Sequence, residues 1–328
     1  MVSPRLEVRH DRLPIRGSFT ISRGSRTHAD LVVVELVDGE ARGRGECVPY
    51  PRYGESVESV LAQIEEQRPL LAAPDARLRL QEAMKPGAAR NALDCALWDL
   101  EAKRAGRRVW DLLGAPAPDP LVTVFTLSLG TPESMAAAAS EAASRPLLKV
   151  KLGGEGDIER IRAVREAAPE ARLVVDANEA WTPDQVEPFL AAMAECGVEM
   201  VEQPLPAGKD EMLSGITRVV PVGADESAHD AAGLEKLVGR YDVVNLKLDK
   251  TGGLTGALAF VRRAEELGLD LMVGCMLGSS LGMAPAILVA QHARFVDVDG
   301  PLLLAEDRTP GLRYDGSTVH PPEAALWG

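Results

Sequence analysis

The stretch Leu147-Leu148-Lys149-Val150-Lys151-Leu152 reads as a β-strand that carries two lysines within an apolar run. Successive side chains of a strand point to opposite faces, so Lys149 and Lys151 share one face and the apolar residues between them share the other. Two ammonium groups on one face are costly to bury unless negative groups lie nearby. The stretch is therefore either a surface strand with a solvated lysine face or part of a charged site that the rest of the chain completes.

From residue 121 onward, short apolar strands alternate with helical stretches. Thr131-Pro132 and Thr182-Pro183 each combine an N-cap residue with proline at the first helical position. The expected strands are 122–127, 147–152, 173–177, 200–202, 219–224, 243–248, 271–274 and 295–299. Eight strands separated by helices predict an α/β fold of the (β/α)8 TIM-barrel type. The segment that contains them is shorter than the roughly 250 residues typical of this fold, so we expect a compact, modified barrel.

The part of the chain before the barrel reads as a small α+β domain. Strand patterns on both sides of Asp38-Gly39 predict a hairpin, and residues 19–26 read as a short strand that enters a Gly/Ser loop. Apolar residues at helical spacing predict a helix near 88–105 that ends at Gly106. We expect a capping domain over 1–118, a barrel over 119–306, and a tail over 307–328 that packs back on the capping domain.

Composition and charge argue against some classes of partner. The chain of 328 residues has a net charge of −13, which disfavours nucleic acid and anionic membranes as partners. No run approaches the roughly 20 apolar residues of a membrane span, and the N-terminus lacks the apolar core of a signal peptide. Four scattered cysteines without a CxxC pair are typical of reduced thiols, so we expect a cytoplasmic protein. A homo-oligomer is compatible with the sequence.

Ionisable residues recur at the C-terminal ends of the expected strands, one βα unit apart. Lys151 to Asp176 is 25 residues, Asp176 to Glu202 is 26, Glu202 to Asp225 is 23, and Asp225 to Lys247 is 22. Each step moves one strand around the barrel, so these side chains should meet at the face where barrel enzymes carry out their chemistry. A lone acid at a strand end is often a helix cap, but five ionisable residues in phase indicate a site.

The composition of this set indicates a metal-assisted reaction. Asp176, Glu202 and Asp225 offer only oxygen ligands with no His or Cys in phase, which favours Mg²⁺ over Zn²⁺. The lysines flank these carboxylates from opposite sides. We therefore expect abstraction of a proton next to a carboxylate, in which the metal stabilises an enediolate and a lysine of lowered pKa acts as the base. Bases on both sides of one carbon would allow its inversion.

These motifs resemble those of the enolase superfamily, in its muconate-lactonising-enzyme-like subgroup. The resemblance extends over nearly the whole chain and rests on Lys149-Val-Lys151, Val175-Asp176-Ala-Asn178, Glu202-Gln-Pro204, Ala224-Asp225-Glu226-Ser227 and Asn245-Leu-Lys247-Leu-Asp249-Lys250. It implies that the three carboxylates bind one Mg²⁺ per subunit, with Mn²⁺ as a substitute, and that Lys151 and Lys247 are the acid/base pair. It also implies that Lys149 tunes Lys151 and that Asn178, Glu226 and Asp249 lie behind these groups.

Three other segments resemble the dipeptide epimerases of that subgroup. Asp297-Val-Asp299 is similar to the Asp-x-Asp element that holds the substrate's α-ammonium. In Ser22-Arg23-Gly24-Ser25-Arg26 the resemblance implies that Arg26 grips the side-chain carboxylate of glutamate, with Arg23 as the alternative. Gly274-Cys-Met276-Leu-Gly278-Ser-Ser280 resembles a seventh-strand segment in which Met276 and Gly278 would border the substrate, and some relatives carry a larger residue at the position of Gly278.

The resemblance therefore implies an Mg²⁺-dependent isomerase for L-Ala-D/L-Glu or related dipeptides, which serves the recycling of cell-wall peptide. The nearest alternative is an N-acylamino acid racemase or o-succinylbenzoate synthase on the same scaffold. Asp297 and Asp299 argue against it, because two carboxylates need a cation that such substrates lack. An alternative of another class is a non-catalytic barrel that binds a sugar acid or metabolite, against which the carboxylates and both lysines argue.

Overall fold

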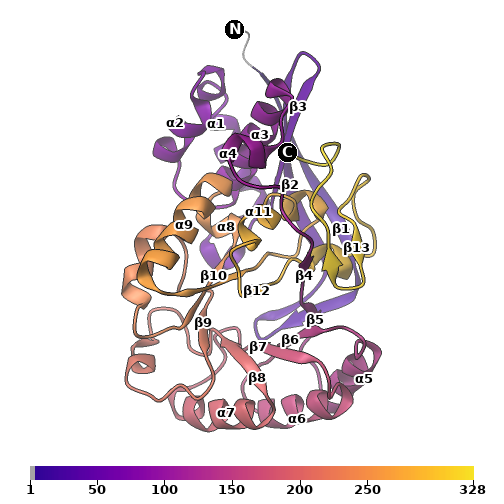
Figure 1. The fold of residues 1–328 in the computed structure, drawn as a ribbon, viewed down its shortest axis with the longest axis vertical. Coiled ribbons are helices and arrows are strands. Elements are labelled where there is room, and N and C mark those ends of the chain that lie inside the picture. Colours follow the sequence, from indigo (N-terminus) through magenta and orange to yellow (C-terminus); the bar gives the residue numbers. More distant parts are fainter. Residues whose placement is uncertain (1–3) are drawn as a thin grey trace.

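The computed structural model describes residues 4–328 and divides them between a capping domain and a barrel. The capping domain is an antiparallel sheet, order β1-β2-β3, with helices packed on one face (Figure 1). Its elements are β1 (Arg5–Ile21), β2 (Gly24–Asp38), β3 (Ala41–Cys47), η1 (Pro51–Tyr53), α1 (Val57–Glu66), η2 (Leu70–Ala72), α2 (Ala76–Ala83), α3 (Ala88–Ala105) and α4 (Val109–Leu113).

Local sequence signals explain the layout of this domain. The Asp38-Gly39 hairpin is confirmed, since Asp38 pairs with Ala41 across the turn and Gly39 has a φ of 59°. The helix expected near 88–105 is α3, and it ends at Gly106 with a φ of 60°. Helix α3 lies close on β3 because Gly45 has no side chain: a Cβ there would come within 2.0 Å of a carbonyl oxygen of α3.

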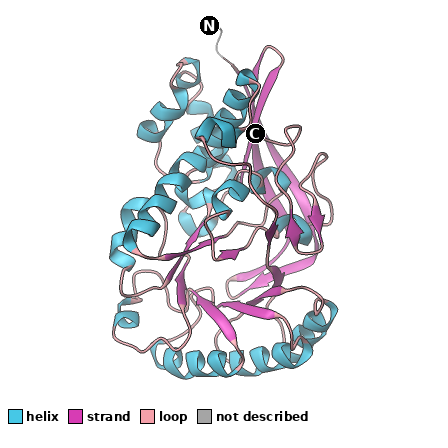
Figure 2. Cartoon of the chain, viewed as in Figure 1, coloured by secondary structure: helices cyan, strands magenta, loops and turns pink. Residues whose placement is uncertain are grey.

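The barrel is a parallel eight-stranded sheet whose spatial order follows the sequence, which confirms the predicted fold class. Helices lie along the outside of its strands (Figure 2). Its strands are β5 (Phe125–Leu127), β6 (Leu147–Lys151), β7 (Arg172–Asp176), β8 (Val198–Glu202), β9 (Val222–Ala224), β10 (Val243–Leu246), β11 (Asp270–Val273) and β12 (Phe295–Val296). The backbone N–H of Val124 donates to Val296 O at 2.9 Å, and this bond joins the last strand to the first.

Helices of unequal length follow the strands. Thr131 caps the first of them and Thr182 forms a capping box with Gln185, as the sequence predicts. The full set is α5 (Pro132–Glu141), α6 (Asp157–Ala167), α7 (Pro183–Glu195), η3 (Glu211–Ser214), η4 (Ala231–Leu237), α8 (Leu248–Thr251), α9 (Leu254–Leu267), α10 (Ser280–Met283), α11 (Ala286–Ala290) and α12 (Gly300–Leu303). The connections after β8 and β9 contain only 3-10 turns, which accounts for the compactness of the barrel.

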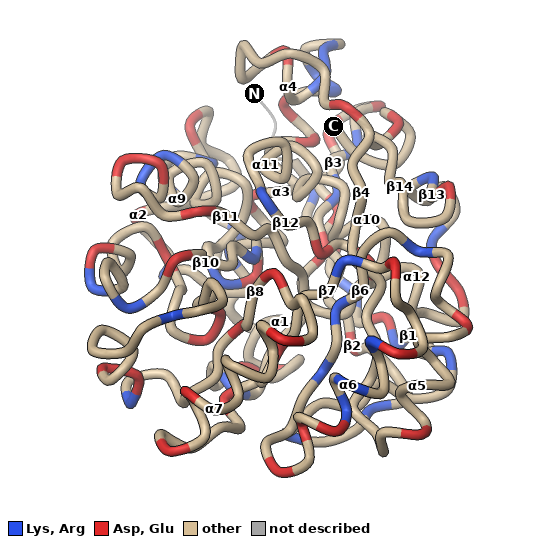
Figure 3. Tube along the Cα trace, turned by 60° about the horizontal axis from the view of Figure 1, so that its bottom comes forward, with Lys and Arg blue, Asp and Glu red and all other residues tan. Residues whose placement is uncertain are grey.

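The inside of the barrel has an apolar floor with a charged layer above it. Apolar side chains from every barrel strand except β9 form the floor, the first of them directly before β5: Val124, Leu147, Val174, Met200, Val243, Met272 and Phe295. On β6, Lys149 and Lys151 point the same way as Leu147, into the barrel, while Leu148 and Val150 pack against the outer helices. The lysine face is therefore the inner face. Charged residues of both signs also lie over the outer helices (Figure 3).

Three expected strand boundaries differ from the observed ones by three residues, and the other differences are smaller. Val122 belongs to β4 (Leu121–Val122), which pairs with β14 (Thr318–Val319) of the tail instead of the barrel. Strand β14 pairs in turn with β13 (Tyr314–Asp315). Strand β9 begins only at Val222, after Pro221, which has no N–H to donate. Strand β12 ends at Val296, because Asp299 turns away to precede α12.

The tail runs back along α3 to the C-terminus at the capping-domain end (Figure 1). Trp327 Nε1 donates to Cys95 O at 3.0 Å, and the N–H of Gly328 donates to Asp99 Oδ1 at 2.6 Å. Within residues 4–328, no helix combines the length and apolar character needed to cross a membrane.

Candidate active site

The ladder of ionisable residues meets at one height inside the barrel. Lys151 pairs with Asp176 and Asp176 with Glu202 in the register of β6, β7 and β8. The set comprises Lys149, Lys151, Asp176, Glu202, Asp225 and Lys247, and none of them is more than 7% exposed. The spacing of about one βα unit thus produces a buried layer at the C-terminal ends of the strands, in which three successive carboxylates are flanked by lysines.

Each carboxylate of this layer contacts a lysine. Lys151 Nζ donates to Asp176 Oδ2 at 2.6 Å, and Lys247 Nζ donates to Asp225 Oδ2 at 2.6 Å. Lys149 Nζ lies 2.6 Å from Glu202 Oε2 and 3.5 Å from Asp176 Oδ2. Lys149 thus contacts the carboxylates directly, whereas the sequence analysis expected it to act on Lys151.

The two signs of charge set the acidity of the carboxyl groups. Burial opposes ionisation of Asp176, but Lys151 and Lys149 outweigh burial and lower its pKa to about 2. Asp225 follows the same pattern, since Lys247 and Lys250 outweigh burial and hold its pKa well below the usual range. Glu202 differs because burial and the charge of Asp176 raise its pKa.

The carboxylates of this layer raise the pKa of Lys149 and Lys247, the opposite direction to the lowered pKa expected of a base beside a bound metal. Burial alone would lower the pKa of Lys247, but Asp225 and Glu202 outweigh it and raise that pKa well above the usual value. The pKa of Lys149 rises for the same reason, with Asp297 as its largest electrostatic partner. Carboxylates within ion-pair distance favour the charged form more strongly than burial disfavours it.

Two participants were quoted in the motifs but received no role in the sequence analysis. Lys250 Nζ donates to Asp225 Oδ1 at 2.7 Å and to Asn245 O at 2.9 Å. Asn245 Nδ2 donates to Glu202 Oε1 at 2.6 Å. The alternation Asn245-x-Lys247 on one strand face was the signal that could have identified Asn245.

The donor set of this layer fits a hard divalent cation. Asp176, Glu202 and Asp225 are fully or almost fully buried and offer only oxygen atoms. Two neighbouring buried oxygens, Asn178 Oδ1 and Asn245 Oδ1, have no hydrogen-bond partner, so acceptor capacity remains around the carboxylates. Carboxylate and amide oxygens are the ligands that Mg²⁺ prefers. The three carboxylates are therefore the residues that could hold such an ion.

The tip of the β1–β2 hairpin reaches across to the end of β7. Ser22 Oγ and Arg23 Nη1 donate to the carbonyl oxygen of Asn178 at 2.9 and 3.0 Å. The N–H of Asn178 in turn donates to Asp176 Oδ1 at 2.9 Å. The expected Gly/Ser loop is thus a tight hairpin end, in which Ile21 pairs with Gly24, and it closes one side of the site.

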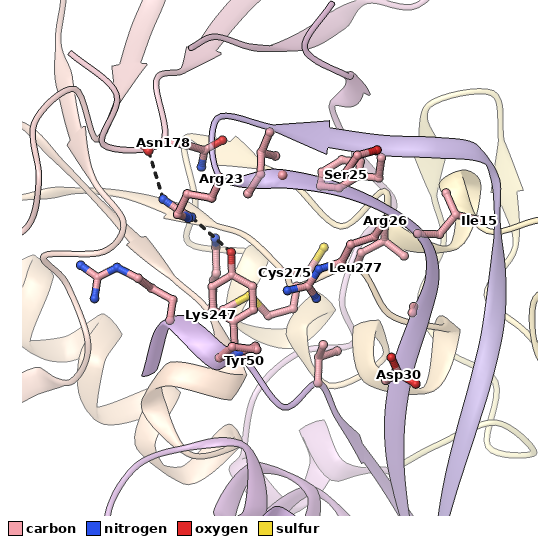
Figure 4. A pocket seen from close by; sticks show the side chains of 18 of the residues that line it. Ile15, Arg23, Ser25, Arg26, Asp30, Tyr50, Asn178, Lys247, Cys275 and Leu277 are labelled. Carbon is pink, nitrogen blue, oxygen red and sulfur yellow. Dashed lines mark hydrogen bonds between the residues drawn. The ribbon is translucent and has the colours of Figure 1, made fainter. Parts of the chain in front are cut away.

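A cavity of about 470 Å³ lies between this hairpin, the 48–53 loop and the strand ends (Figure 4). Among the expected site residues, it is bordered by Arg23, Arg26, Lys151, Asn178, Asp225, Glu226, Lys247 and Met276. Its wall also contains residues that the sequence analysis missed, namely Ile15, Phe19, Tyr50, Tyr53, Cys275 and Leu277. Apolar residues in loops and on a sheet edge carry no chemical motif, so only the fold reveals them.

The two arginines of the hairpin have different environments. Arg23 is occupied, because its Nη2 lies 2.7 Å from Glu226 Oε1 and its Nη1 lies 3.2 Å from Glu179 Oε2. Arg26 stacks over the ring of Tyr50 at 5.6 Å, and its guanidinium points into the cavity (Figure 4). Within residues 4–328, no oxygen accepts a hydrogen bond from the Arg26 guanidinium, so it is the arginine that can bind an added carboxylate.

Asp297 and Asp299, which follow β12, each accept a hydrogen bond from within the chain. Asp297 Oδ2 accepts from Lys149 Nζ at 2.7 Å, and Asp299 Oδ2 accepts from the N–H of Thr126 at 2.6 Å. Burial and the charge of Asp297 raise the pKa of Asp299 to about 7. One ligand atom each from Asp297, Asp299 and Cys275 lie within 4.8 Å of one another. An added cation would relieve the repulsion between these two carboxyl groups.

Glu226 and Gly278 differ in their relation to the cavity. Glu226 is buried at its edge, where burial and the charge of Asp225 raise its pKa to about 7. Gly278 faces Glu46, Val48 and Met283 instead of the cavity, and a Cβ there would lie 3.2 Å from Glu46 Oε1.

Asp249 joins the barrel to the capping domain. Its Oδ1 accepts from the N–H of Val48 at 3.0 Å and from Asn91 Nδ2 at 2.8 Å. Its contacts are thus with the capping domain and not with the three carboxylates.

Two family models together match most of the chain. Residues 134–325 match the enolase C-terminal domain-like family, and residues 4–114 match the N-terminal domain of mandelate racemase / muconate lactonizing enzyme. Among curated relatives, an L-Ala-D/L-Glu epimerase of Escherichia coli is 45% identical over 96% of this chain and 99% of its own. An N-acetyl-D-glutamate racemase of Pseudoalteromonas sp. is 44% identical over 91% of this chain and 95% of its own.

Solved structures agree with these relatives. An enolase family member from Agrobacterium tumefaciens with homology to dipeptide epimerases, with bound sodium and L-Ala-L-Glu, superposes with a TM-score of 0.97. It is 58% identical and the match covers 99% of this chain and 100% of that one. Other matched structures are dipeptide epimerases in complex with Mg and a dipeptide.

Proposed function

Because this chain belongs to the mandelate racemase / muconate lactonizing enzyme family of the enolase superfamily, we propose that it epimerises L-Ala-D/L-Glu or closely related dipeptides. The observation that carries the proposal is the pair Lys151 and Lys247, which enter the same cavity from β6 and from the end of β10. Two ammonium/amine groups on different strands can serve the two faces of one carbon.

The two lysines divide the proton transfer. One of them, as the amine, takes the proton from Cα of the C-terminal residue, and the other, as the ammonium, delivers a proton to the opposite face. Lys151 and Lys247 each lie 2.6 Å from a carboxylate, so their positions are fixed before the substrate binds. Fixed donors on both faces lower the entropic cost of the transfer.

Asp176, Glu202 and Asp225 would hold the Mg²⁺. When bound, the cation supplies positive charge that stabilises the negative charge developing on the substrate carboxylate and offsets the carboxylates that favour protonated lysines. Relatives that hold Mg together with a dipeptide support this assignment. The buried, all-oxygen donor set supports it independently.

Substrate recognition would come from both domains. Arg26 of β2 would bind the side-chain carboxylate of the C-terminal glutamate, since its guanidinium points into the cavity without an acceptor of its own. Asp297 and Asp299 would bind the α-ammonium of the N-terminal residue. A cation there would offset the repulsion that raises the pKa of Asp299. We also propose that the enzyme works in the cytoplasm and serves the recycling of cell-wall peptide.

A second candidate activity is the racemisation of an N-acylated amino acid. It is favoured by the N-acetyl-D-glutamate racemase of Pseudoalteromonas sp., which is almost as similar in sequence as the E. coli epimerase. Both substrates present a glutamate carboxylate to Arg26, so that residue does not separate them. The difference is the α-ammonium, which only the dipeptide offers to Asp297 and Asp299.

The test is the exchange of the Cα proton in deuterated water, followed by NMR for L-Ala-L-Glu and N-acetyl-L-glutamate in parallel. We expect faster exchange and epimerisation of the dipeptide, dependent on Mg²⁺ and abolished by EDTA. Asp297→Asn should weaken turnover of the dipeptide more than that of N-acetylglutamate. Faster turnover of N-acetylglutamate by the unmodified protein would favour the second activity, and no exchange with either would refute both.

A further inference from the structure

A second cavity lies behind one wall of the active-site cavity. It has a volume of about 380 Å³, opens to solvent, and is lined by residues of β1, β5, α12, α5 and the turn after α5. Two side chains of β1, Ile15 and Phe19, border both this cavity and the active-site cavity. These two residues therefore form a partition, one side chain thick, between the two spaces.

The partition sits where β1 bends. The register between β1 and β2 shifts between Pro14 and Phe19, and Gly17 within this interval has a φ of 68°. The bend is fixed to the barrel on one side: the N–H of Ala305 donates to Pro14 O at 2.8 Å, and Arg16 Nε donates to Leu304 O at 2.9 Å. Ile15 is thus held against the segment that follows α12.

The other end of the bend is fixed to the loop after β5. The N–H of Leu129 donates to Thr20 O at 3.0 Å, and Ser128 Oγ donates to Ser18 O at 3.4 Å. These bonds lie on both sides of Phe19 in the chain. The ring of Phe19 is therefore positioned by backbone contacts with the barrel and not only by packing.

The partition faces the region assigned to the N-terminal residue of the substrate. Lys151 Nζ lies 5.8 Å from the centre of the Phe19 ring. Thr126, which borders the second cavity, donates its N–H to Asp299, one of the two carboxyl groups assigned to the α-ammonium. The N-terminal residue, placed between Lys151 and Asp299, would have Phe19 beside its side chain and the second cavity behind that ring.

The lining of the second cavity defines what it can accept. Besides Ile15 and Phe19, its lining combines two kinds of side chain. The apolar ones are Phe125, Leu127, Ala138, Ala142, Leu302 and Leu303, and the polar ones are Arg16, Ser18, Thr126, Ser128, Glu141 and Arg145. Aliphatic walls gain from burial of hydrocarbon surface. The apolar part of the lining therefore suits a branched aliphatic side chain.

On the basis of the proposed function, we propose that Phe19, with Ile15, determines the specificity for the N-terminal residue. The partition restricts that position to a small side chain such as alanine. The second cavity is a latent subsite, and removal of the Phe19 ring joins it to the active-site cavity so that dipeptides with N-terminal leucine are accepted.

The test compares kcat/KM for L-Ala-L-Glu and L-Leu-L-Glu in the wild type and in Phe19→Ala. We expect the ratio of leucine to alanine substrate to rise at least about tenfold, since a few methylene groups in an apolar pocket are worth that factor or more. The matched control is Phe125→Ala, which enlarges the second cavity without opening the partition and should leave the ratio unchanged.

Two outcomes would contradict the proposal that Phe19 restricts the N-terminal residue. One is an equal loss for both substrates in Phe19→Ala, and the other is an equal rise of the ratio in Phe125→Ala. If Phe19→Ala does not fold, Phe19→Leu should show a smaller rise in the same direction, and an unchanged ratio there would also overturn it. Absence of turnover of L-Ala-L-Glu by the wild type would instead refute the proposed function.

Discussion

Lys149 Nζ lies 2.7 Å from Asp297 Oδ2, so the second barrel strand is joined to the segment after the last one. The same ammonium group lies 2.6 Å from Glu202 Oε2. Lys149 therefore links a carboxylate assigned to the metal with a carboxylate assigned to the substrate. Its side chain is almost completely buried, so the charge has no alternative partner in solvent.

The substitution Lys149→Met should lower the free energy of unfolding. It leaves Glu202, Asp297 and Asp176 buried without their shared cation, which costs about 3–5 kcal/mol of unfolding free energy. Urea denaturation without divalent cation would measure the loss, and Mg²⁺ should restore more stability in the variant than in the wild type. Exposed Lys85→Met is the control, with a change within about 0.5 kcal/mol. A loss in Lys149→Met no larger than in the control would contradict the proposed role.

Removing either base alone should abolish proton exchange at one face of Cα and leave exchange at the other face. In deuterated water, Lys151→Ala and Lys247→Ala are each expected to lose exchange from one epimer of Ala-Glu while exchange from the other persists. The physical reason is that each amine reaches only one face of the carbon. NMR of both epimers measures this directly. If either variant exchanged both epimers, a two-base transfer would be ruled out.

Arg26→Ala should raise KM for L-Ala-L-Glu by about ten- to a hundredfold, because a charge-assisted hydrogen bond contributes about 1.5–3 kcal/mol. KM for L-Ala-L-Leu should change little, since leucine offers no carboxylate. Arg23→Ala is the informative comparison. Arg23 holds the hairpin against Glu226, Glu179 and Asn178, so its loss should impair both substrates alike. A larger glutamate-specific defect in Arg23→Ala would transfer the assignment to Arg23.

Asp249→Asn should flatten the pH dependence of stability. Burial raises the pKa of Asp249 to about 7 from an ordinary value of 3.8. A carboxyl group whose pKa is higher in the folded state stabilises the fold below the unfolded pKa, and this contribution is lost as pH rises through the folded pKa. The wild type should therefore lose stability relative to Asp249→Asn between about pH 4 and pH 7, by at most about 4 kcal/mol.

Denaturation at several pH values measures the effect. Asparagine Oδ1 can still accept from Val48 N and Asn91 Nδ2, so the substitution should preserve the contact between barrel and capping domain. Exposed Asp119→Asn is the control and should keep the pH profile of the wild type. Parallel profiles for Asp249→Asn and the wild type would contradict the prediction.

The sequence by itself determined the barrel and the position of its charged layer. Period-two alternation placed Lys149 and Lys151 on one face of β6, and steps of one βα unit placed Asp176, Glu202 and Asp225 on successive strands. These are consequences of local geometry: side chains alternate along a strand, and parallel strands of similar length end at the same height. Caps at Thr131, Thr182 and Gly106 were equally local, and all three were confirmed.

Only the tertiary structure decided which groups are free to act. Arg23 and Arg26 are indistinguishable as sequence, but residues in the segments after β7 and β9 bind Arg23 and leave the Arg26 guanidinium without an acceptor. The raised pKa of Lys247 and the partition formed by Phe19 likewise depend on atoms distant in the chain. Electrostatic and packing energies depend on the distance between atoms in space. Beyond one strand or helix, this distance cannot be inferred from the separation of two residues along the sequence.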